Sequence, residues 1–137
     1  MFKKIRPALV IAVYLASSGA VTIAAAQSAV PAMRGEGAAR YVCGGIGSDE
    51  STAFRASMKD HPLALLFARA DGAYEADVAV SIQDDKNTTA LAFRASGPVC
   101  LIDLPAGKYI VNADAGRTSK TQSVTVGGGS KSVDFRF

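Results

Sequence analysis

The single histidine of this chain restricts the chemistry that the chain could perform. His61 is the only histidine among 137 residues. A zinc peptidase needs two histidines with a glutamate, and a serine triad needs a histidine base beside an activated serine. Pro62 follows His61 and disfavours helical backbone there, and the sequence contains no Gly-x-Ser-x-Gly segment. We therefore expect an exposed histidine that ends a helix, and no catalytic, metal-binding or cofactor-binding residue.

Two cysteines, Cys43 and Cys100, are a second source of chemistry. They lack the Cys-x-x-Cys spacing of redox enzymes and cannot complete a four-ligand zinc site with one histidine. In an oxidising compartment they allow one intramolecular pairing. The sequence favours a Cys43–Cys100 disulfide, worth about 4 kcal/mol on the chain-entropy model. The alternative is two separate buried thiols.

Three further segments resemble binding motifs only weakly. Asp84-Asp85 with Asn87 could hold calcium weakly, but calcium loops supply more oxygen ligands, so a solvated turn is favoured. Glu75 and Asp77 are interpreted as a solvated strand face rather than a catalytic pair. Gly44 to Gly47 lacks the lysine and spacing of a phosphate loop, and predicts a turn with close backbone packing.

Residues 1–26 form a predicted signal peptide. A basic start with Lys3, Lys4 and Arg6 precedes an apolar run and then Ala24-Ala25-Ala26, where cleavage is expected; an uncleaved membrane anchor is the alternative. Cleavage would remove three of the 15 basic residues and leave 12 basic against 12 acidic residues. This neutral balance argues against nucleic-acid binding. We expect a periplasmic or secreted protein that meets a membrane only through an uncleaved signal segment.

The remaining chain is long enough for one domain. Residues 27–40 are small and polar and predict a flexible N-terminal arm, followed by a domain at 41–137. Ser48 is expected to cap a helix of about ten residues, with Phe54 and Met58 on its apolar side. Residues 63–68 are apolar on both faces, as expected for a strand that a helix covers on one side.

Period-two alternation dominates the rest of the sequence. Tyr74, Ala76, Val78, Val80 and Ile82 are expected to share a buried face. The central feature is a strand, a tight turn and a second strand. Leu104 and Tyr109 are expected in the core there, and Pro105 and Gly107 in the turn. With turns every eight to twelve residues, the pattern predicts an all-β, seven-stranded antiparallel sandwich with one short N-terminal helix.

The C-terminal half resembles the carboxypeptidase regulatory-like domain, a transthyretin-like or immunoglobulin-like sandwich. The segments that carry the resemblance are 76–82, 104–111, 123–126 and 133–135, with an LPxGxY core at Leu104, Pro105, Gly107 and Tyr109. The N-terminal helix and the following strands are similar to small exported bacterial proteins of unassigned role. The resemblance implies a module without a catalytic site of its own.

Two classes of function remain. The first is an exported, non-catalytic module that binds an unknown protein or glycan in the bacterial envelope through a strand edge, the loops or the arm. The second is a small periplasmic hydrolase or metal-dependent enzyme with an unfamiliar site. The single histidine favours the first.

Overall fold

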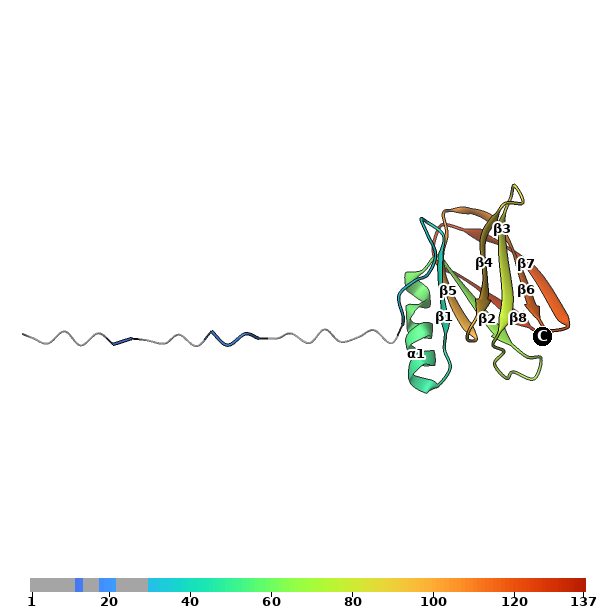
Figure 1. Cartoon of the computed structure of the whole chain (residues 1–137). Helices are drawn as coiled ribbons and strands as arrows, with labels where there is room; N and C mark the ends of the chain where they lie inside the picture. Colours follow the sequence, from blue (N-terminus) through green and yellow to red (C-terminus); the bar gives the residue numbers. More distant parts are fainter. Residues whose placement is uncertain (1–11, 14–17, 22–29) are drawn as a thin grey trace, which may run out of the picture.

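The computed structural model describes residues 12–13, 18–21 and 30–137, which include a sandwich of two β-sheets with one helix packed beside it (Figure 1). The predicted signal peptide lies mostly outside the described residues, as does the beginning of the predicted arm. No helix within the described ranges is both long and apolar enough to cross a membrane.

Eight strands and one α-helix follow in the order β1, α1, β2 to β8. A short 3-10 helix, η1, extends α1. The bounds are β1 Arg40–Gly44, α1 Ser48–Ser57, η1 Met58–Asp60, β2 Leu63–Ala68, β3 Val78–Asp84, β4 Thr89–Ala95, β5 Val99–Asp103, β6 Gly107–Ala115, β7 Thr118–Val126 and β8 Lys131–Arg136.

The strands divide equally between two sheets. Sheet A has the order β1-β5-β2-β8 and sheet B the order β4-β3-β6-β7. The predicted sandwich is thus confirmed, but the prediction of seven strands, all antiparallel, is wrong in two respects. The segment at Tyr41 forms a full strand, β1, and β8 pairs with β2 in parallel. Alternation tells which side chains share a face and does not tell which strands are neighbours or in which direction they run.

The core between the sheets contains the alternating residues expected from the sequence. Val78, Val80 and Ile82 of β3 are buried, as are Tyr109, Val111 and Ala113 of β6. The strand β2 is apolar on both faces, as predicted. Its odd-numbered residues Leu63, Leu65 and Phe67 enter this core, whereas Ala64 and Leu66 face a second cluster under α1.

The helix α1 covers the outer face of sheet A, where it lies beside β1 and β5 (Figure 1). Phe54 is fully buried there among Val42, Val99 and Leu101, and Met58 packs against the same cluster. The predicted helix length is confirmed, but Ser48 is its first residue rather than its cap. Gly47 occupies the N-cap position with φ 86°, a backbone angle that favours glycine.

The expected inward face of Tyr74 and Ala76 is wrong. Strand β3 begins only at Val78, because Asp77 adopts a left-handed φ of 63° that interrupts the extended chain. Tyr74 instead forms an isolated bridge with Ala68, and its side chain is 57% exposed. An aromatic residue that the sequence places in the core therefore lies on the surface.

Candidate functional site

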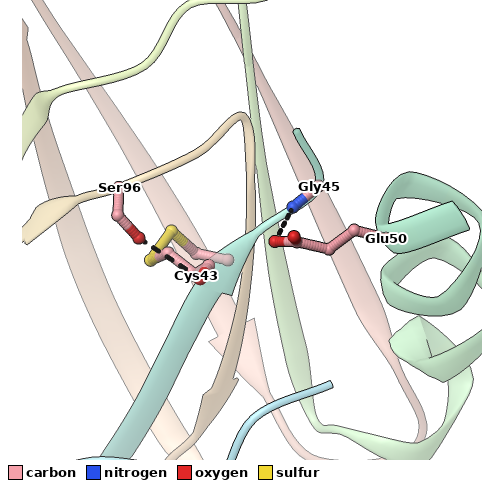
Figure 2. Close-up of a disulfide and its surroundings, with 5 residues drawn as sticks. Cys43, Gly45, Glu50 and Ser96 are labelled. Carbon is pink, nitrogen blue, oxygen red and sulfur yellow. Dashed lines mark hydrogen bonds between the residues drawn. A yellow bond between two sulfur atoms is a disulfide. The ribbon is translucent and has the colours of Figure 1, made fainter. Parts of the chain in front are cut away.

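Cys43 and Cys100 form a disulfide between neighbouring strands (Figure 2), as predicted. The two residues are direct partners in the β1–β5 ladder, with Cα atoms 4.1 Å apart and an S–S distance of 2.07 Å. Ser96 donates a hydrogen bond of 3.3 Å from its Oγ to the main-chain oxygen of Cys43. The bond thus fixes β1, where the described part of the arm enters the sandwich, to a central strand of sheet A.

The glycine-rich segment after β1 brings the backbone close to the helix. A Cβ atom on Gly44 would overlap the Phe54 ring and the Glu50 carboxylate. That carboxylate accepts the N–H of Gly45 at 2.9 Å (Figure 2). The structure therefore gives these glycines a packing role, which agrees with the expected turn and close backbone approach.

His61 is not the exposed residue that the sequence predicts. Its Nδ1 lies 2.8 Å from Oδ1 of Asp103, and its side chain is only 19% exposed. His61 does end the helical segment, as its extended backbone shows. The β5 strand ends at Asp103, and the sandwich brings this strand end to the helix end, 42 residues away in sequence. A histidine with an orienting carboxylate can serve as a base for a serine hydroxyl. The hydroxyl of Ser130, the residue just before β8, donates its hydrogen to the main-chain oxygen of Lys59.

The acidic candidates form local contacts. Oδ1 of Asp84 accepts the N–H groups of Lys86 and Thr88, each at 2.9 Å, and so closes the β3–β4 turn. Glu75 pairs with Arg69 and Asp77 with Arg94 on the surface. Within the described ranges, no group of three or more histidine, cysteine, aspartate or glutamate residues has the arrangement of a metal site.

The segment with Leu104, Pro105, Gly107 and Tyr109 connects the two sheets. Leu104 is buried after β5 of sheet A, and Gly107 is already the first residue of β6 in sheet B. Tyr109 donates its hydroxyl hydrogen to the oxygen of Pro105 at 2.7 Å. Burial raises the pKa of Tyr109, and the nearby carboxylates of Asp84 and Asp85 raise it further. This arrangement fixes the crossing between the sheets and presents no reactive group to solvent.

The edge strands of the two sheets contact each other at both sides of the sandwich, β1 with β4 and β7 with β8, and β1 also pairs with part of the arm. Arg34 exchanges two backbone hydrogen bonds with Tyr41 and so covers part of β1. The Tyr41 ring in turn stacks on Phe93 of β4, with centroids 4.1 Å apart. At the other side of the sandwich, Gln122 of β7 donates from its side chain to the main-chain oxygen of Asp134 in β8 at 2.6 Å, so this contact joins the edge strands of the two sheets. The Arg34–Tyr41 bridge pairs backbone groups of β1 and so protects that part of its edge from pairing with other chains.

The edge strand β7 is the longest of the four. It has nine residues, of which seven are exposed, and it pairs only with β6. Its sequence is rich in threonine and serine, contains no proline and has one charge, Lys120. A hollow of about 380 Å³ adjoins the β6–β7 pair; its lining residues are Asp85, Lys108, Tyr109, Ile110, Ser123, Val124 and Thr125. An extended chain added to β7 would lie next to this hollow.

Sequence reasoning identified β7 as a strand but not as an edge. It placed Val124 and Val126 inward, and Val126 is indeed buried while Val124 is half-buried. The available signal was the preceding run from Thr118 to Gln122, which is polar on both faces. A run without an apolar face contributes little to the core between the sheets, as expected near the margin of a sandwich.

Comparison with protein-family models and with curated proteins gives no match to this chain.

Proposed function

We propose that this chain is an exported, non-catalytic β-sandwich module that binds an extended segment of another protein of the bacterial envelope along β7. The observation that carries the proposal is the length and exposure of β7, which is the longest of the four edge strands and has seven of its nine residues exposed, with one side-chain contact to β8 at Gln122. A free edge offers a row of unpaired N–H and C=O groups, and main-chain pairing with it supplies affinity. The hollow at Ile110 and Ser123 would then select the partner's side chains.

Export is part of this proposal. The Cys43–Cys100 disulfide supports a periplasmic or secreted location, because such bonds persist in oxidising compartments. The basic and apolar N-terminal sequence supports the same location. We also propose that the sandwich is a divergent carboxypeptidase regulatory-like domain of transthyretin-like type. The LPxGxY residues Leu104, Pro105, Gly107 and Tyr109, at the crossing between the sheets, support this assignment.

The binding proposal is tested by capture from a bacterial envelope extract with two matched double variants. Thr121→Lys with Ser123→Lys places two charges on β7, and charged side chains block edge pairing. Thr89→Lys with Ala92→Lys places the same charges on exposed positions of β4, the opposite edge of sheet B. We expect the native protein and the β4 variant to retain the same partner protein, and the β7 variant to lose it.

Two outcomes would contradict the binding proposal. Equal retention by both double variants would show that β7 is not the contact surface. Retention of a polysaccharide in place of a protein would assign a glycan-binding role instead.

The His61–Asp103 contact favours one alternative, a small periplasmic hydrolase. A histidine held at 2.8 Å by a carboxylate resembles the base and orienting acid of acyl-transfer enzymes. The test is turnover of a small ester or peptide by purified protein, compared with His61→Gln. The hydrolase would lose turnover in that variant, whereas the binding module would show no turnover and unchanged partner capture in both forms.

A further inference from the structure

A cleft separate from β7 lies on the outer face of sheet A, between α1 and β8. The helix contacts β1 and β5 and leaves the outward side chains of β8 uncovered. In the parallel β2–β8 ladder, Leu66 is paired with Asp134 and Ala68 with Arg136. These four residues, together with Arg55 of α1 and Tyr74 of the β2–β3 loop, line a pocket of about 170 Å³. We call it the Arg55–Arg136 pocket.

The charges of this pocket favour an anion. Arg55 donates from Nη2 to the hydroxyl of Tyr74 at 2.9 Å, and its guanidinium lies 5.6 Å from the centre of the Tyr74 ring. Among the described residues, no carboxylate forms an ion pair with Arg55 or Arg136, whereas Arg69 and Arg94 are both paired. Two arginines and one acidic residue, Asp134, thus line the pocket. Guanidinium groups bind carboxylates through paired hydrogen bonds.

A second hollow of about 450 Å³ adjoins the pocket at Tyr74 and Pro98, which line both, and its lining also includes Ser48 and Ser51. Its other apolar residues are Ile46 and Ala76. Ile46 is 62% and Tyr74 57% exposed, and they are the large hydrophobic side chains left exposed between residues 30 and 137. The hydrogen bond from Gly45 to Glu50 holds the backbone that carries Ile46. The anion pocket and the hollow thus form one cleft with a charged end and an aliphatic end.

We propose that this cleft binds a peptide carboxylate that adjoins an aliphatic side chain. The carboxylate would lie between Arg55 and Arg136, and the aliphatic side chain would cover Ile46 and Pro98. Asp134 would accept an N–H of the same peptide. A uronic acid satisfies the arginines equally well, and Ser48 and Ser51 offer hydroxyl groups to it, but Ile46, Ala76 and Pro98 in the same lining would leave its other hydroxyl groups without partners. The two-part lining therefore favours a peptide over an acidic sugar.

The carboxylate has two possible sources in a peptide, the C-terminus and an acidic side chain. Three acetylated probes distinguish them: Ala-Ala-Val-Leu with a free C-terminus, the same peptide as an amide, and Ala-Asp-Val-Leu as an amide. Binding is measured by titration of isotopically labelled oxidised protein followed by amide chemical shifts. We expect one of the two carboxylate probes to bind about tenfold more tightly than the Ala-Ala-Val-Leu amide. The chemical-shift changes should centre on Ile46, Ala68 and Tyr74.

Substitutions test the same cleft from the protein side. Arg136→Gln removes an exposed guanidinium that has no ion pair among the described residues, so the fold is expected to remain intact. We expect this variant to weaken the preferred carboxylate probe about threefold to fivefold. Arg117→Gln, the same exchange in the exposed β6–β7 turn, is the control and should leave binding unchanged.

Several outcomes would overturn the proposal. They are equal affinity for the amide and both carboxylate probes, shifts located away from this cleft, and equal weakening by Arg117→Gln and Arg136→Gln. Tighter binding of galacturonic acid than of every peptide would also overturn it and would assign the cleft to an acidic sugar. None of these results depends on β7, so the edge-binding proposal stands or falls separately.

Discussion

Gly44 shows how strongly one residue constrains the contact between the helix and the sheet. A Cβ atom at this position would overlap the ring of Phe54, which is fully buried and cannot move away freely. We expect Gly44→Ala to lower the free energy of unfolding by about 1–3 kcal/mol through overpacking. Denaturant unfolding at neutral pH measures the change.

Gly107 provides the matched control for that substitution. A Cβ atom there would meet only the Tyr109 ring, at an ordinary contact distance of 3.7 Å, and the backbone φ is not in the left-handed region. Gly107→Ala should therefore change the free energy of unfolding by about 0.5 kcal/mol or less. Equal losses in the two variants would show that the close approach at Gly44 does not decide its stability.

Tyr109 predicts a dependence of stability on alkaline pH. Because burial raises the pKa of the folded phenol, the contribution of its neutral form is fully present below the unfolded value of about 10 and is lost as pH rises through the folded value. Tyr109→Phe should remove this loss and also cost about 1 kcal/mol at pH 7, since the hydrogen bond to Pro105 disappears. Urea unfolding from pH 7 to 11 measures both effects; parallel pH curves for variant and parent would refute the assignment.

For single residues, the sequence predicted which side chains are buried better than it predicted which side chains contact each other. The apolar character of Leu104 and Phe54 was sufficient to place them in the core, and both are buried. The pairing of His61 with Asp103 was not predictable, because 42 residues separate them and only the tertiary fold brings them together. Tyr74 was misplaced because the alternation continues through Asp77, whereas its backbone turns.

At the scale of elements, the parallel pairing of β8 with β2 was beyond sequence reasoning. Hairpin turns indicate antiparallel neighbours, but β8 follows a glycine-rich loop and returns to a strand that lies more than sixty residues earlier. Similarly, the sequence predicted a strand, a tight turn and a second strand at LPxGxY, but it did not tell that the two strands belong to different sheets. The strands β3, β6 and β8 were predictable because they carry period-two burial, whereas β2 and β5 are buried on both faces and the polar β7 was the least distinct.

The position of β8 leads to a prediction about the C-terminal residues. Phe135 is 1% exposed, and Phe137 exchanges backbone hydrogen bonds with Ala68 and Ala70. Removing residues 135–137 should lower the free energy of unfolding by about 4 kcal/mol or more, because a buried aromatic ring alone is worth about 3–5 kcal/mol. Thermal unfolding measures the loss, with the exposed Arg136→Ala as control. An unchanged melting temperature after truncation would show that β8 does not complete the core.

For the whole molecule, the Cys43–Cys100 bond determines how much of the stability depends on an oxidising compartment. The bond joins residues 57 positions apart. Reduction should lower the free energy of unfolding by about 4 kcal/mol on the chain-entropy model. Denaturant unfolding with and without reductant measures the difference, and intact mass verifies the gain of two hydrogen atoms. Identical unfolding midpoints for the two redox forms would contradict this prediction.

The central claim, that β7 is the surface that meets a partner, is tested most directly by amide hydrogen exchange. Purified protein is compared alone and with the envelope protein that it captures. Strand addition predicts that alternate amides between Thr118 and Thr125, which face away from β6, become protected in the complex, while β4 amides keep their exchange rates. Unchanged exchange along β7, with protection elsewhere in the sandwich, would contradict the account.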